Sequence, residues 1–152
     1  MRRSLITIVA LVAGAIAVRA QQADSLKRLM DGPPVKAALA AVKTEEPRTI
    51  RDQIRFCEIP APEFKEHERG KELQRVFQEI GLDNVHVDKA GNVLGSYAGA
   101  AARPHLVIAA HLDTVFPEGT DVKVKQEGAI LHGPGIGDDC RGLAVLVAIA
   151  RE

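Results

Sequence analysis

Apolar positions at helical spacing predict helices through much of the first half of the chain. Residues 24–47, "DSLKRLMDGPPVKAALAAVKTEEP", indicate two helices separated by a Gly-Pro-Pro break. Residues 48–62 repeat apolar positions at a helical period and end in prolines, which predicts a third helix. The clearest helix is expected within residues 63–82. Its apolar stripe precedes a glycine suited to a helix C-terminus: Leu73, Val76, Phe77 and Ile80, then Gly81.

Further along the chain the apolar period changes to two, which predicts strands. Residues 84–99 indicate one hairpin, and residues 121–133 indicate a second that turns at Glu127–Gly128. Between them, "HLVIAA" at 105–110 is an uninterrupted apolar run, typical of a strand buried on both faces. Residues 133–152 combine a glycine-rich loop with an apolar helix. Helices and strands mixed in this way predict the α/β class, and we expect a three-layer α/β/α sandwich.

The first 20 residues have the pattern of a secretory signal peptide. Arg2 and Arg3 precede an apolar run that ends before "RAQQAD". This run is shorter than the roughly 20 apolar residues that span a bilayer. We therefore expect cleavage after Ala20, a mature chain from Gln21, and export to the periplasm or the cell exterior without stable membrane insertion. The alternative is an uncleaved membrane anchor.

Charge and cysteine content narrow the partners and the covalent chemistry. The 152 residues contain 20 Lys and Arg and 20 Asp and Glu, without a basic block, so we expect no nucleic-acid partner. An exported chain is free to form disulfides. However, Cys57 has the spacing of a core residue and Cys140 lies in a Gly/Asp motif, so we expect no bridge between them.

Two polar residues follow the apolar run of 105–110 directly. His111 and Asp113 would lie at the carboxyl end of a central strand, where ligands gather in α/β sheets. Imidazole is the commonest metal ligand in proteins, and a carboxylate often holds its second ring nitrogen. His-x-Asp alone is also compatible with a solvated strand end.

The second candidate motif is "GPGIGDDCRG" at 133–142. Its glycines do not fit the register of a dinucleotide-binding loop, and a phosphate-binding lysine is absent. Asp138 or Asp139 could cap the following helix. Carboxylates aimed at the same edge of the sheet as His111 fit a metal site better.

Together these motifs resemble a known family of zinc-dependent exopeptidases and deacylases, which includes peptidase T, acetylornithine deacetylase and the glutamate-releasing carboxypeptidases. The resemblance runs from "CEIPAPEFKEHERG" through "DKAGNVLG" and "AAHLDTVFPEG" to "GPGIGDDCRG". It implies a three-layer sandwich of the zinc-exopeptidase type. It also implies a metal-dependent hydrolase that cleaves peptide or related amide bonds, with two zinc ions in the complete enzyme. The implied substrates are peptides or N-acyl amino acids, and a homodimer is possible.

The resemblance also assigns roles to residues. His111 would bind one zinc ion, and Asp113 would hold and polarise its imidazole as the catalytic residue. Asp139 would bridge the two zinc ions, because it lies three residues before Gly142, and Asp138 would be its neighbour. A cis peptide is implied after the bridging aspartate, at Asp139–Cys140. The other histidines match no ligand of the family: His67, His86, His105 and His132.

The sequence departs from the family pattern near its end. The general-base glutamate, the glutamate beside it and the remaining ligands would follow the bridging aspartate by a few tens of residues or more. The smaller domain of the family is also missing. We therefore expect residues 21–152 to be the N-terminal portion of a metallopeptidase catalytic domain, incomplete at the C-terminus, inactive alone and a poor zinc binder. The alternative is a non-catalytic binding module with the hydrolase fold. Aminopeptidase, carboxypeptidase and deacylase activities all remain open.

Overall fold

The computed structural model describes residues 24–101, 103 and 105–152, and the chain divides into two compact units, residues 1–43 and 44–152. The expected signal peptide, residues 1–20, lies outside the described residues. Residues 24–31 are helical, and α2 (Pro33–Thr44) follows after Gly32, which confirms the predicted break. Proline suits the first turn of α2 because the N–H it lacks has no partner there anyway. Among the described helices, none has the length and apolar content needed to cross a bilayer.

Three helices form the centre of the second unit. They are α3 (Glu46–Cys57), α4 (His67–Ile80) and α5 (Cys140–Arg151), and each was predicted from the sequence. α4 begins at His67, because residues 63–66 form turns and Phe64 has a φ of 64°. Gly81 ends α4 in the left-handed conformation, with a φ of 87°, which glycine adopts without the steric cost of a Cβ atom.

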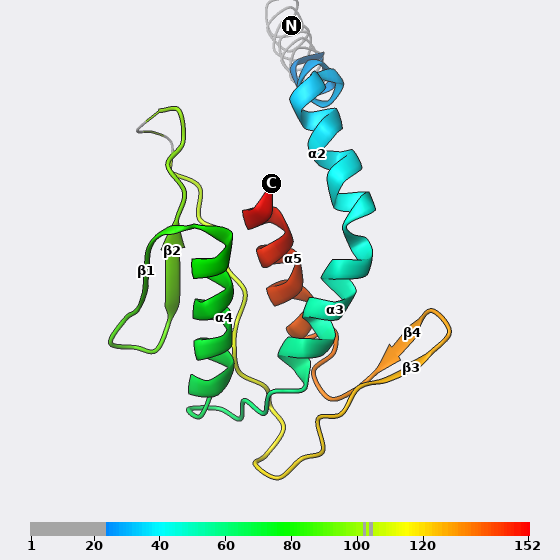
Figure 1. Cartoon of the computed structure of the whole chain (residues 1–152), viewed down its shortest axis with the longest axis vertical. Helices are drawn as coiled ribbons and strands as arrows, with labels where there is room; N and C mark the ends of the chain where they lie inside the picture. The colour runs from blue at the N-terminus through cyan, green and yellow to red at the C-terminus, as the bar shows by residue number, and fades with distance from the viewer. Residues whose placement is uncertain (1–23, 102, 104) are drawn as a thin grey trace, which may run out of the picture. The chain divides into compact units, whose positions relative to one another are not determined.

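The core lies where the three helices meet. Six buried side chains form one cluster, drawn from all three helices: Phe56, Leu73, Val76, Phe77, Leu143 and Val147. Burying each such side chain contributes about 1.5–3 kcal/mol. Figure 1 shows α4 beside α5, with the hairpin of β1 and β2 on its other side, and both strands contact α4.

The strands form two separate antiparallel hairpins, as the alternating pattern predicts. β1 (Asp83–Val87) pairs with β2 (Val93–Ser96), and β3 (Lys125–Glu127) pairs with β4 (Ile130–His132). Each forms a two-stranded sheet of its own. The described residues therefore have α/β character.

The predicted strand at 105–110 is wrong. These residues form no strand (Figure 1), and Leu106 and Val107 are each 84% exposed. An apolar run becomes a buried strand only where neighbouring strands pair with it. Here the strands on either side in the sequence pair within their own hairpins. The chain approaches the core only afterwards, where Ala110 and Leu112 pack against it.

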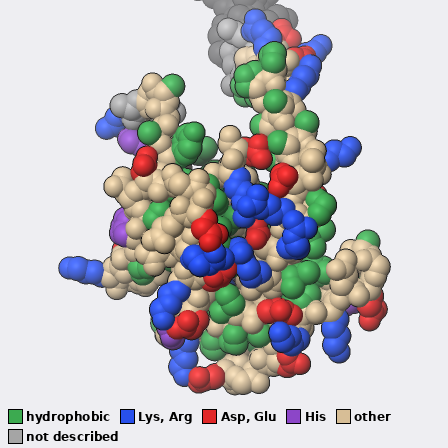
Figure 2. Space-filling model, viewed as in Figure 1, with side chains coloured by type: hydrophobic (Ala, Val, Ile, Leu, Met, Phe, Trp, Pro, Cys, Tyr) green, Lys and Arg blue, Asp and Glu red, His purple; other side chains and the backbone are tan. Residues whose placement is uncertain are grey.

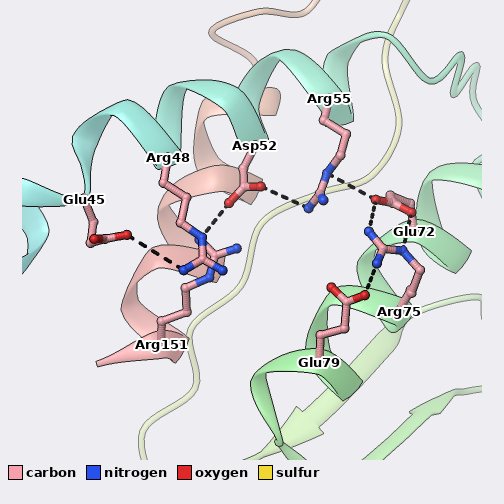
Figure 3. Close-up of polar contacts among 8 residues, drawn as sticks. All are labelled: Glu45, Arg48, Asp52, Arg55, Glu72, Arg75, Glu79 and Arg151. Carbon is pink, nitrogen blue, oxygen red and sulfur yellow. Dashed lines mark hydrogen bonds and ion pairs between the residues drawn. The ribbon is translucent and has the colours of Figure 1, made fainter.

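A network of charged side chains ties the three helices together (Figure 3). Asp52 of α3 forms ion pairs with Arg55 at 3.0 Å and with Arg151 of α5 at 2.7 Å. Arg55 reaches Glu72 of α4 at 3.1 Å, and Arg75 holds Glu72 at 2.8 Å. In the space-filling view, side chains of both signs gather at the centre of this face (Figure 2). The side chain of Asp52 is only 8% exposed, so its two ion pairs are shielded from water.

Candidate metal centre

The segment that carries His111 and Asp113 is fixed to the turn between α3 and α4. The backbone N–H of Thr114 donates to the carbonyl of Ala61 at 2.8 Å, and its hydroxyl donates to the same oxygen at 3.3 Å. Pro62 and Thr114 also form an isolated parallel bridge. Thr114 is buried, so this attachment is protected from solvent.

The glycine-rich loop that carries the two aspartates is fixed to α3. The amide of Gln53 donates to the carbonyl of Ile136 at 2.7 Å, and the thiol of Cys57 donates to the carbonyl of Pro134 at 3.3 Å. Both donors lie on buried residues. Two attachments therefore bring the His-x-Asp segment and the Gly/Asp loop together, although Asp138 lies 27 positions after His111 in the sequence.

The imidazole of His111 lies between two carboxylates. Its Nδ1 is 3.1 Å from Oδ1 of Asp113 and 3.1 Å from the carbonyl oxygen of the same residue. Its Nε2 is 2.8 Å from Oδ1 of Asp138. Asp113 therefore occupies one ring nitrogen, as the resemblance implies, and the other nitrogen faces a solvent-exposed carboxylate.

Asp139 has a different environment. It occupies the N-cap position of α5, but its side chain makes no capping hydrogen bond. Instead Oδ2 accepts a hydrogen bond from the backbone N–H of His111 at 3.1 Å. Its Oδ1 lies against Gly142, where any Cβ atom would overlap the carboxylate. One oxygen of Asp139 thus accepts from the main chain of His111, and the other packs against Gly142.

The carboxylate that contacts Nε2 of His111 is that of Asp138, whose side chain is 91% exposed, and not that of Asp139, which the resemblance implies as the metal ligand. The expected position of the cis peptide is wrong. It joins Asp138 to Asp139, one bond earlier than Asp139–Cys140.

The surrounding acids set the charge of His111. A hydrogen bond with Asp138 raises the pKa of His111. Asp113 and the charge of Asp139 also raise this pKa, whereas partial burial lowers it. Without a metal, these acids therefore stabilise the protonated imidazole, which can donate to a carboxylate from each ring nitrogen. A cation at Nε2 would replace that proton.

The donor set fits zinc in kind but not in number. Imidazole nitrogen and carboxylate oxygen are both ligands of zinc, and a catalytic site normally has three protein ligands. Nε2 of His111 and the carboxylate of Asp138 supply two. Within residues 24–101, 103 and 105–152, no group of three or more His, Cys, Asp or Glu side chains could hold a metal ion.

The remaining histidines and the cysteines lie outside this constellation. Exposed His67 pairs with Glu68, and exposed His132 pairs with Glu127. Nδ1 of His86 lies 2.6 Å from the carbonyl oxygen of Asn84. Cys57 and Cys140 are free, fully buried thiols. A hydrogen bond with Cys57 and burial raise the pKa of Cys140, so its thiol stays protonated. The sequence placed Cys57 in the core and Cys140 in the Gly/Asp motif, but gave no sign that the two thiols interact.

Comparison with known families bears on the segment that holds both motifs. Residues 92–152 match the model of peptidase family M28. The M28 segment includes His111, Asp113 and the two adjacent aspartates, covers less than half of the chain, and excludes α3 and α4. It supports a metal-dependent peptidase in general terms and does not single out peptidase T or the deacetylases. No curated protein sequence matches the chain.

Proposed function

We propose that this chain is part of a zinc-dependent hydrolase that cleaves peptide or related amide bonds. The observation that carries the proposal is the contact between Nε2 of His111 and the carboxylate of Asp138. Both residues fall within the segment that matches peptidase family M28. An imidazole and a carboxylate that converge from two loops form a donor pair suited to zinc.

Each residue of the constellation has a separate role in this proposal. His111, through Nε2, and Asp138 hold the metal. Asp113 holds Nδ1 of the imidazole and so fixes the orientation of the ring. Asp139 fixes the backbone of His111 and does not bind the metal. Zinc, when bound, would polarise the scissile carbonyl and lower the pKa of a water molecule.

The finer features of the expected enzyme belong to the same proposal. They are a second zinc ion, exopeptidase activity on peptides or N-acyl amino acids, a three-layer α/β/α sandwich, and export directed by residues 1–20. The donor count supports a further ligand from outside the described residues, because His111 and Asp138 are fewer than the three of a usual catalytic site.

Calorimetric zinc titration of the full chain tests the ligand assignment. The adjacent aspartates provide a matched pair of variants, since Asp138→Asn and Asp139→Asn each remove one charge with little change in shape. We expect weak binding by the wild-type chain and loss of the heat signal in His111→Ala and Asp138→Asn. Asp139→Asn should keep most of the affinity, because its amide oxygen can still accept from the His111 N–H. Loss in Asp139→Asn with retention in Asp138→Asn would refute the assignment.

Turnover of dipeptides and N-acyl amino acids by the zinc-loaded chain separates the enzyme from a binding module. Any activity of this site should fall about tenfold or more in Asp113→Asn, which leaves the imidazole without an anionic partner. Hydrolysis of either substrate class would decide for the enzyme over the binding module, and would contradict the expectation that this portion is inactive alone.

A further inference from the structure

Arg69 of α4 is a buried cation that the assigned roles leave unexplained. Its side chain is among the largest fully buried ones, with the residue 1% exposed. Burying a guanidinium is costly unless its donors are satisfied. Within the described part of the chain, its three hydrogen bonds all go to main-chain carbonyls. Nε and Nη2 donate to Ile59 at 3.1 and 2.7 Å, and Nη1 donates to Leu112 at 2.7 Å.

The carbonyl of Leu112 is the important acceptor because Leu112 lies between His111 and Asp113. The Nδ1 of His111 contacts both the carbonyl and the carboxylate of Asp113, so the backbone in this stretch determines whether the ring and the carboxylate meet. A hydrogen bond to Leu112 fixes the peptide that joins it to Asp113. The other side of the fork binds the carbonyl of Ile59, two residues before Ala61, whose own carbonyl accepts from Thr114.

We propose that Arg69 is a positioning residue for the zinc site, because its guanidinium fork fixes the main chain between His111 and Asp113. This inference rests on the proposed function for its zinc-binding consequence, but the geometry it predicts exists without metal. The planar fork of arginine reaches two carbonyls at once, whereas the ammonium of lysine is a single point charge on a flexible stem. The fork itself, and not only the charge, should therefore be required.

Electrostatics supports the same role. Burial lowers the pKa of Arg69, and the negative charge of Asp113 acts against this effect. The positive charge of Arg69 thus lies near the carboxylate of Asp113.

The test compares Arg69→Lys and Arg69→Met with Val76→Ala in the full chain. Val76 is buried two turns further along α4 and belongs to the core cluster, so its truncation destabilises the same helix without removing a hydrogen bond to the main chain between His111 and Asp113. The first measurement, without metal, is the ¹⁵N signature of the His111 ring together with hydrogen exchange at the Thr114 amide. The second is zinc affinity by calorimetry.

We expect both arginine variants to change the ring signature, to lose protection at Thr114 and to weaken zinc binding about tenfold or more. Val76→Ala should keep the wild-type ring signature and affinity below its unfolding temperature. If Arg69→Met fails to fold, Arg69→Lys, which retains the charge, decides the question. Wild-type ring signals in Arg69→Lys, or equal changes in Val76→Ala, would overturn the inference. If the wild-type chain binds no zinc, the proposed function fails, and the metal-free measurement still decides the role of Arg69.

Discussion

The carboxylate of Asp139 accepts a hydrogen bond from the backbone N–H of His111 at 3.1 Å, although Asp139 occupies the N-cap of its own helix. The carboxylate therefore joins the start of α5 to the His-x-Asp segment and does not satisfy an N–H of the first turn. Two consecutive aspartates thus make different contacts. The exposed carboxylate of Asp138 contacts the imidazole of His111, and the carboxylate of Asp139 holds the backbone N–H of the same residue.

Removing the side chain of Asp139 should destabilise the fold modestly. Asp139→Ala leaves the His111 N–H without its anionic acceptor, and a hydrogen bond to a charged group contributes about 1.5–3 kcal/mol. Asp139→Asn keeps an acceptor of the same shape and should lose less than half as much. Urea unfolding followed by circular dichroism measures both. Equal losses in the two variants would mean that charge, and not the hydrogen bond, is what matters.

Gly142→Ala provides a test in which helix propensity and packing predict opposite signs. Alanine inside a helix is favoured over glycine by about 1 kcal/mol. However, a Cβ atom at position 142 would overlap the carboxylate of Asp139. We expect net destabilisation and weaker zinc binding. Gly137→Ala is the matched control, because its Cβ would meet nothing within 4 Å. A stabilised Gly142→Ala variant would show that the carboxylate moves freely.

The ion pairs of Asp52 should matter more than those at the surface. Asp52→Ala removes the partner of both Arg55 and Arg151, and the side chain of Arg151 is only 14% exposed. Removing one member of a buried pair costs about 3–5 kcal/mol, and we expect a loss near the lower end because Arg55 is more exposed. Glu79→Gln, which removes an exposed partner of Arg75, should change stability by less than about 0.5 kcal/mol. Urea midpoints of the two variants measure the difference.

Glu72 should contribute to the acid sensitivity of the fold. A hydrogen bond from Arg75, followed by the charge of Arg55, lowers the pKa of Glu72 below its ordinary value. Its ionised form therefore stabilises the fold above the unfolded pKa of about 4.3, and this contribution is lost as the pH falls through the folded pKa. Glu72→Gln should be less stable at pH 6, by about 1 kcal/mol, and should lose less stability than the wild type between pH 6 and pH 3. The control is Glu63→Gln, an exposed position before α4. Parallel curves for Glu72→Gln and the wild type would exclude this contribution.

Local patterns predicted the elements that are stabilised locally. The apolar stripe of α4 and its terminal Gly81 depend on residues within a few turns, as do both hairpins. The apolar run at 105–110 failed as a predictor because burial requires neighbouring strands, which the residues of the run do not encode. The cysteine pair and the fork of Arg69 also depend on segments that are far apart in the sequence.

The choice between Asp138 and Asp139 as metal ligand depends on a different kind of pattern. The sequence "GPGIGDDCRG" can be aligned in two registers. In the first, the spacing from Gly133 and Gly135 indicates Asp138. In the second, the spacing to Gly142 indicates Asp139. The second register reflects packing, because Gly142 accommodates the carboxylate of Asp139. The first register would have indicated Asp138, whose side chain reaches Nε2 of His111. A glycine near a carboxylate therefore identifies the residue that packs closely, which need not be the residue that binds a ligand.

The exposed run at 106–108 should make the chain prone to self-association. Leu106 and Val107 are each 84% exposed, and the segment has no strand partner among the described residues. Exposed apolar segments with unpaired backbone groups are templates for intermolecular strand pairing. Val107→Lys places a charge in the run and removes no buried contact, so it should suppress concentration-dependent association with less than about 0.5 kcal/mol change in stability.

Val115→Lys is the matched control, because Val115 is a valine that is 93% exposed outside the run. Light scattering over a concentration series should show a clear decrease in association for Val107→Lys and a smaller one for Val115→Lys. Equal decreases would attribute the association to exposed apolar area in general, and a large loss of stability in Val107→Lys would show that residue 107 is covered in solution.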